Sequence, residues 1–118
     1  MSNAKGGAFE RELMKYLRED LKQDVERLRL SGKEDEGDLL IRESTGDRLV
    51  IEAKNVKAMD VAGWVKEAEV EAKNYAEHRG IYQPDFAVVH KRRGKGAADA
   101  YVTMPLREYM RQRMTPPF

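Results

Sequence analysis

The sequence has no cysteine, no long apolar run and no large excess of charge of one sign. Without cysteine, the chain forms neither disulfides nor thiolate metal sites, which fits a reducing compartment. No apolar run approaches the roughly 18 residues that a membrane-spanning helix needs, and the N-terminus lacks the apolar segment of a secretory signal. We therefore expect a cytoplasmic protein with no part in a membrane.

Charged residues are abundant all the same. They make up 36% of the 118 residues, and the formal net charge is only +1. This balance excludes a polybasic tail protein, so any contact with nucleic acid has to come from local basic patches. The length suits one domain with a single core, and we assign residues 1–118 to it.

Apolar periodicity and turn residues predict an α/β domain with the element order αβββαββα. Helices are expected over 8–22, about 61–79 and 105–113, and strands over 24–30, 38–43, 47–55, 85–89 and near 100–104. Asp60 suits the N-cap of the second helix, and Gly80 suits its C-terminal stop. This order predicts a central mixed sheet of about five strands flanked by helices.

Charged residues lie at the ends of two strands that otherwise read as core. Asp38 opens one apolar run, and Glu52 and Lys54 interrupt the end of the next. Such charges are costly in a core unless they are paired or bound to a metal. Because side chains alternate along a strand, Glu52 and Lys54 share a face. The simplest alternative is a surface salt bridge between these two residues.

The hairpin between the two strands decides whether Asp38 joins that face. A three-residue loop over 44–46, with its glycine in the left-handed conformation, would pair Glu43 with Asp47. Counting back along both strands, Asp38 then lies opposite Glu52, with their β-carbons about 5 Å apart. A two-residue loop would put Asp38 on the other face. A site made of both acids therefore requires an odd loop or a bulge.

The expected group of ligands suits a hard cation. The carboxylates of Asp38 and Glu52 and the backbone carbonyl of Ala53 are oxygen ligands of the kind that Mg²⁺ prefers. A metal ion at this position would polarise a phosphate and deprotonate a bound water. The ammonium group of Lys54 would then orient that water or neutralise developing charge. The pattern thus predicts a metal-dependent phosphodiesterase site.

Glu10 is a further acid that the sequence places near this site. At about 100° per residue, it lies within roughly 60° of the apolar residues of the first helix, at the centre of their stripe. These residues are Leu13, Met14, Leu17 and Leu21. One reading makes Glu10 a metal ligand or a support for one. The other leaves it in water, on a first turn that extends past the core.

The stretch 5–13 resembles the opening of the archaeal Holliday-junction resolvases, which belong to the PD-(D/E)xK nuclease superfamily. Both begin with a basic residue and glycine, followed by a helix that starts with Glu-Arg-Glu-Leu. Asp38 matches the first acid of that family, Glu52 and Lys54 match its E-x-K, and Glu10 matches its helix-1 glutamate.

The resemblance covers about residues 5–56 in motif and the rest in element order alone. It implies a restriction-endonuclease-like fold, Mg²⁺ or Mn²⁺ as cofactor, and DNA cleavage. For junction resolvases it further implies a homodimer acting on Holliday junctions or other branched DNA, in recombination and repair. Ser31 resembles a serine that the family holds near its active site. Gly37 departs from the family, where a proline usually precedes the first acid.

Glu71 and Tyr75 resemble a variant of the Q-x-x-x-Y helix motif of RecB-type nucleases, with Glu in place of Gln. Glu71 would then be an accessory site residue; the alternative is polar surface at the boundary of the helix's apolar stripe. Because the sequence resembles two branches of the superfamily, a RecB-like or restriction-type nuclease that acts on linear DNA with partner subunits stays open as an alternative. A non-catalytic DNA-binding module with the same fold is a third reading.

One glycine-containing loop carries the densest basic cluster of the chain. Its residues are Lys91, Arg92, Arg93 and Lys95. Cations on such a loop suit phosphate contacts, although a solvated hairpin loop is the plainer reading. Lys5 and Lys33 could flank the same groove. His78 and His90 are expected at the surface or its boundary, where His90 could contact phosphate.

Overall fold

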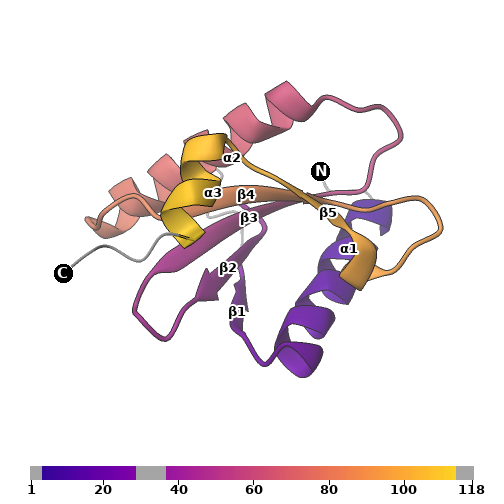
Figure 1. The fold of residues 1–118 in the computed structure, drawn as a ribbon, viewed down its shortest axis with the longest axis horizontal. Helices are drawn as coiled ribbons and strands as arrows, with labels where there is room; N and C mark the ends of the chain where they lie inside the picture. Colours follow the sequence, from indigo (N-terminus) through magenta and orange to yellow (C-terminus); the bar gives the residue numbers. More distant parts are fainter. Residues whose placement is uncertain (1–3, 29–36, 114–118) are drawn as a thin grey trace.

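The computed structural model describes residues 4–28 and 37–113, with residues 4–6 described by their backbone alone. It shows an α/β fold built on one five-stranded mixed sheet, in the order β1-β2-β3-β4-β5 (Figure 1). The strands are β1 (Asp24–Arg27), β2 (Leu39–Arg42), β3 (Arg48–Lys54), β4 (Asp85–His90) and β5 (Tyr101–Thr103). The helices are α1 (Ala4–Lys15), α2 (Val61–Arg79) and α3 (Leu106–Arg113), with a π-helical turn η1 (Tyr16–Asp20) and a 3-10 turn η2 (Ala97–Asp99).

The predicted element order and strand number are confirmed, and α2 has the predicted bounds. The side chain of Asp60 accepts a hydrogen bond from the Gly63 N–H at 3.1 Å, as an N-cap does. Gly80 ends the helix with a φ of +62°, in the left-handed conformation that favours glycine. The first helix differs from its prediction. It begins at Ala4, although two glycines lie in its first turns, and gives way to η1 at Tyr16.

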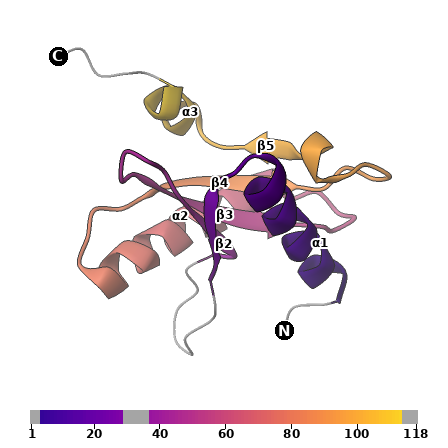
Figure 2. The same ribbon diagram turned by 90° about the horizontal axis from the view of Figure 1, so that it is seen from below.

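The sheet lies between α1 and α2, which cover its opposite faces (Figures 1 and 2). β1, β2 and β3 form an antiparallel meander. β4 then lies parallel to β3, and the connection between them is α2, because parallel neighbours require a crossover. β5 is antiparallel to β4. Within the described ranges, no helix has the length and apolar character needed to cross a membrane.

Each face of the sheet carries its own apolar core. The buried residues on the α2 face are Leu28, Leu40, Val50, Trp64, Ala68, Ala72, Tyr75, Phe86 and Val88. Those on the α1 face are Phe9, Leu13, Val25, Leu39, Ile41, Ile51 and Val89. Since Val50 faces α2 and Ile51 faces α1, alternation along β3 puts Glu52 and Lys54 on the α2 face. The charged end of β3 thus lies under α2.

Candidate functional site

The hairpin between β2 and β3 has the predicted three-residue loop. The Glu43 N–H donates to the Asp47 carbonyl at 2.9 Å, and Gly46 has a φ of +93°. Leu39 is paired with Ile51 at the far end of the ladder, which is the register that the odd loop requires. The prediction of an odd loop is confirmed, so the residue before Leu39 falls on the α2 face.

That residue is Asp38, and the register places it opposite Glu52. Its carboxylate accepts a hydrogen bond from the Ala53 N–H at 2.7 Å. Because the N–H and C=O of one strand residue point to the same side, the Ala53 carbonyl is directed to the side on which Asp38 lies. The structure therefore brings together the three groups that the sequence selected as metal ligands.

Gly37 has a clear structural role in presenting Asp38. Its φ of +103° lies in a region that proline, fixed near −65°, does not enter. A β-carbon added at Gly37 would lie 2.7 Å from Cγ1 of Val50, a distance that requires the neighbour to shift. The departure from the proline of the resembled family thus follows from the path that this chain takes into β2.

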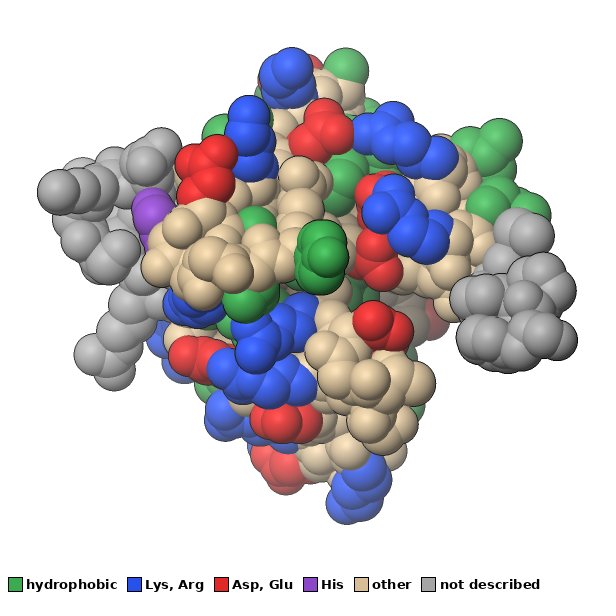
Figure 3. Space-filling view, turned by 90° about the vertical axis from the view of Figure 1, so that its left-hand side faces the viewer, with side chains coloured by type: hydrophobic (Ala, Val, Ile, Leu, Met, Phe, Trp, Pro, Cys, Tyr) green, Lys and Arg blue, Asp and Glu red, His purple; other side chains and the backbone are tan. Residues whose placement is uncertain are grey.

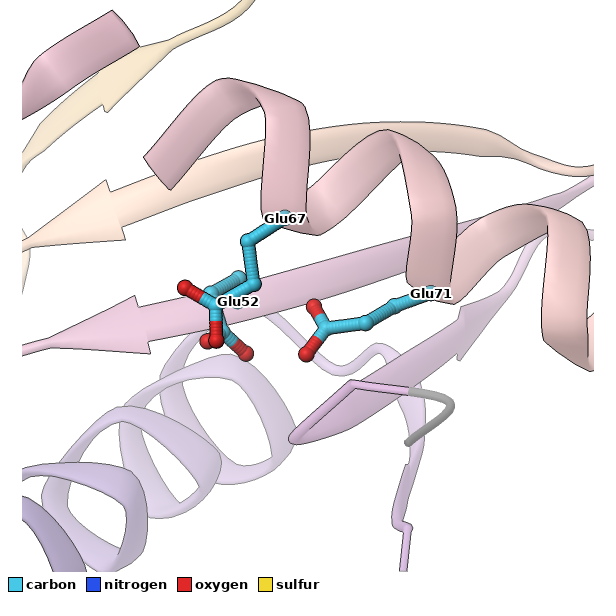
Figure 4. Close-up of side chains that lie close together, drawn as sticks. All are labelled: Glu52, Glu67 and Glu71. Carbon is cyan, nitrogen blue, oxygen red and sulfur yellow. The ribbon is translucent and has the colours of Figure 1, made fainter. Parts of the chain in front are cut away.

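Two glutamates of α2 complete an acidic cluster with Glu52. Oxygens of Glu52, Glu67 and Glu71 lie within 4.8 Å of one another, and both helix residues reach down from α2 toward β3 (Figure 4). Glu71 is only 2% exposed, so its reading as boundary surface was wrong. Glu67 was missed in the sequence. The sequence feature that could have identified it is its spacing of four residues from Glu71. Two like charges at that spacing on a helix repel each other, and a nearby cation would relieve the repulsion.

The ammonium group of Lys54 lies between two of these acids. Its Nζ is 2.8 Å from Oε1 of Glu67 and 3.1 Å from Oε2 of Glu52. Burial by itself lowers the pKa of Lys54, but the hydrogen bonds and charges of Glu67 and Glu52 outweigh it, and the pKa is raised. Burial likewise opposes ionisation of Glu67, yet hydrogen bonds from Glu52 and Lys54 hold its pKa below the usual value. Lys54 and Glu67 thus form a charged pair inside the site.

Glu52 has a buried carboxylate oxygen that suits a cation. The residue is 4% exposed, and its Oε1 has no hydrogen-bond partner among the residues that the structure describes. Burial, with the negative charges of Asp38 and Glu71, raises the pKa of Glu52 to about 12. A divalent cation would supply Oε1 with a partner and offset that repulsion. The residues therefore fit Mg²⁺ or Mn²⁺, with Asp38, Glu52, the Ala53 carbonyl and the α2 glutamates as available ligands.

Glu10 approaches the site from the opposite face of the sheet. It is 9% exposed, so the reading that left it in water was wrong. Burial raises the pKa of Glu10, and so does the nearby charge of Asp38, while Arg27 at 3.6 Å opposes the shift. Glu10 is not part of the acidic cluster under α2. Its position fits electrostatic support of Asp38 better than direct membership of that cluster.

Several other predicted residues lie apart from the cluster or outside the description. Tyr75 is buried in the core of the α2 face, where Arg79 stacks 3.7 Å from the centre of its ring and Arg48 donates to its hydroxyl at 3.4 Å. Lys5 lies within α1, but its side chain is not described. Ser31 and Lys33 lie outside the described residues.

The basic loop after β4 is held at both ends by Glu12. Oε1 of Glu12 lies 3.3 Å from the ammonium group of Lys91, and Oε2 accepts a hydrogen bond from the Ala97 N–H at 2.7 Å. Arg93 and Lys95, between these anchors, are exposed. Of the four basic residues, Lys91 is therefore occupied by an internal ion pair, and the others face solvent or a neighbouring ring.

His90 departs from the expected surface position. It is 7% exposed, its ring lies 5.4 Å from that of Trp64, and its Nε2 is 2.8 Å from the hydroxyl of Thr103. Burial lowers the pKa of His90. The cause is its register, because it pairs with Lys54 on β3 and so shares the covered α2 face. His78 is exposed, as predicted.

The acidic cluster and the basic loop meet at the same end of the sheet, where β3 and β4 both finish. No protein-family model matches the chain, and no curated protein matches its sequence. Carboxylates that fit a divalent cation, one lysine among them and a basic loop beside them suit chemistry on a phosphate.

Proposed function

We propose that this protein is a metal-dependent endonuclease of the PD-(D/E)xK type that hydrolyses DNA phosphodiester bonds. The observation that carries the proposal is the register of the hairpin. It sets Asp38 opposite Glu52 on the face that also presents Lys54, as the sequence pattern required. The α/β fold with its five-stranded mixed sheet is compatible with that superfamily.

Each residue has a distinct part in this proposal. Asp38, Glu52 and the Ala53 carbonyl would hold Mg²⁺ or Mn²⁺, with Glu67 or Glu71 as further oxygen ligands. The metal, when bound, would polarise the phosphate and supply a deprotonated water. Lys54 would place its ammonium group beside the reacting phosphate and offset the charge that develops there. Glu10 would support Asp38 through its charge.

The preferred substrate is branched DNA, such as a Holliday junction, cut by a homodimer that presents two sites. Two sites related by a two-fold axis suit the symmetric cutting of two strands. This part of the proposal comes from the family resemblance of the first residues and of the acid and lysine pattern. A RecB-like or restriction-type nuclease that acts on linear DNA remains the second candidate, because the buried Glu71 matches the helix motif of that branch.

The test is cleavage of a synthetic four-way junction in Mg²⁺, compared with linear duplex and single strands of the same sequence. Asp38→Asn should lower the cleavage rate by on the order of a hundredfold to a thousandfold, because it removes a ligand of the metal that would stabilise the charge developing on the phosphate. Asp20→Asn, which makes the same change at an exposed position, should leave the rate unchanged. Symmetric nicking of the junction that Asp38→Asn abolishes would support junction resolution.

Two other results point elsewhere. Equal cutting of linear duplex that depends on Asp38 would favour the general nuclease over the resolvase. DNA binding without cleavage in either Mg²⁺ or Mn²⁺ would sink the enzyme proposal and leave a non-catalytic DNA-binding module. Sedimentation of the protein with and without junction DNA tests the homodimer directly.

A further inference from the structure

A pocket of about 790 Å³ lies beyond the ends of β3 and β4. One wall comes from the segment 55–59, which leads from β3 to α2, and the other from residues 90–94 at the end of β4 and in the basic loop. Both connections lie at the right-hand edge of Figure 1. The volume falls within the roughly 300–1,000 Å³ that is typical of ligand sites. The pocket is thus large enough for a nucleotide-sized group.

Tyr101 supplies this pocket with an exposed aromatic ring. Tyr101 is 53% exposed, and its ring contacts that of His90 edge-on, with centroids 5.8 Å apart. His90 in turn packs on buried Trp64, so these two rings hold the Tyr101 ring in position. The guanidinium of Arg92 lies 4.7 Å from the centre of the Tyr101 ring. A supported ring beside a guanidinium is the arrangement on which unpaired bases stack.

Two further cations line the same pocket. Lys57 and Arg93 both line the pocket and are exposed, and neither is in an ion pair within the part of the chain that the structure describes. At the opposite end of the molecule, acidic and basic side chains are interspersed (Figure 3). Positive charge that is not neutralised by the protein is what a phosphate backbone requires.

The pocket adjoins the candidate metal centre. Asn55, which lines it, directly follows Lys54, and His90 is the residue paired with Lys54 across the β3–β4 ladder. A phosphodiester held beside Lys54 therefore has the pocket as its immediate neighbour. The next nucleotide of the same strand has an aromatic ring and two cations within its reach.

We propose that this pocket holds an unpaired nucleotide of the DNA substrate, with its base on Tyr101 and its phosphate against Lys57 and Arg93. The proposal rests on the nuclease function proposed above and deepens it by naming the substrate class, a strand with unpaired nucleotides at a branch point. Bases inside a continuous duplex are stacked on both sides and have no free face for the ring. The pocket thus gives a physical reason to prefer a fork with an unpaired strand over a continuous duplex.

The test is fluorescence anisotropy in EDTA with two forked DNAs. One has an unpaired arm of thymidines, and the other has an arm of abasic residues with the same number of phosphates. Because stacking contributes about 1–3 kcal/mol per base, the wild type should bind the thymidine fork about 5- to 150-fold more tightly. Tyr101→Leu should abolish this preference, and Tyr101→Phe should retain it.

Two controls separate the pocket from general effects. Tyr82→Leu changes a tyrosine that is 97% exposed between α2 and β4, and it should keep the preference for thymidine. Lys57→Ala and Arg93→Ala should each lower the slope of log affinity against log salt by about 0.7, the value for one phosphate contact on a single strand. Lys73→Ala, an exposed lysine on α2, should leave the slope unchanged.

Equal affinity for the two forks, or a preference that survives in Tyr101→Leu, would overturn the proposal. Displacement of the fork by thymidine monophosphate at the affinity of the fork itself would also overturn it, in favour of a site for free nucleotides. Since EDTA prevents cleavage, the outcome is independent of the nuclease test. Base-dependent binding by a protein that never cuts DNA would support the pocket while removing the nuclease function.

Discussion

The two faces of the sheet solve the same packing problem in different ways. The α1 face is an apolar core in which the structure describes a single buried acid, Glu10, at 3.6 Å from Arg27. The α2 face has an equally apolar centre, but at the end of β3 it gathers several acids around one lysine. Buried like charges raise the free energy of the folded state. Packing on the α1 face thus stabilises the fold, whereas the acids on the α2 face destabilise it. A cation bound among those acids would remove the destabilisation.

The largest effect on stability is expected on the α1 face. Leu39 is fully buried there, and Leu39→Ala should lower the free energy of unfolding by about 2–5 kcal/mol, through lost burial and the cavity left behind. Leu106→Ala, at a residue 74% exposed, should change it by about 0.5 kcal/mol or less. Urea unfolding of both variants measures the difference. Similar values for the two would break the contrast between core and surface.

On the α2 face, a substitution should stabilise the protein. The pKa of Glu52 is raised to about 12, so the folded state must take up a proton at neutral pH that the unfolded state does not bind. The stability that the protonated group contributes is complete below about pH 4.5 and is lost as the pH rises. Glu52→Gln removes this dependence and should gain up to about 3 kcal/mol at pH 7, with no gain near pH 4.5.

Mg²⁺ sharpens that prediction, because a cation bound to the ionised carboxylate takes the place of the proton. Added Mg²⁺ should raise the midpoint of thermal unfolding of the wild type and leave Glu52→Gln unchanged. Thermal unfolding followed by circular dichroism at about pH 7 measures both. If the wild type without metal is more stable than Glu52→Gln, the buried acids of the α2 face do not destabilise the folded state, and the prediction is wrong.

The smallest effect is expected at His90. Burial lowers its pKa, so the stability that it contributes is present above about pH 6.5 and is lost as the pH falls through the folded-state value. His90→Gln should therefore reduce the loss of stability between about pH 8 and about pH 5, relative to His78→Gln at an exposed position. Urea unfolding at the two pH values gives the comparison. An equal loss in both variants would show that His90 is not strained by burial.

Local rules explain which parts of this fold could be predicted from the sequence. The bounds of α2 follow from Asp60 and Gly80, and the register of the hairpin follows from Gly46, because each of these residues fixes the backbone near itself. The alignment of Asp38 with Glu52 is a consequence of that register. None of these features depends on a contact with a distant segment of the chain.

The missed features depend on contacts between distant segments. Glu67 reads as helix surface until β3 is placed beneath it, and His90 reads as boundary until Trp64 covers it. The link from Glu12 to the basic loop joins residues 85 positions apart. Single-sequence periodicity assigns each of these side chains to a face of its own element, but it does not say what covers that face.

The anchoring of the basic loop by Glu12 has a mechanical consequence. One carboxylate of α1 binds the first residue of the loop and the residue just after it, so the loop is closed by a side chain instead of by its own backbone. Its shape is therefore coupled to the docking of the N-terminal helix. Any local opening that detaches α1 from the sheet would release the loop and the core of the α1 face together, as one cooperative unit.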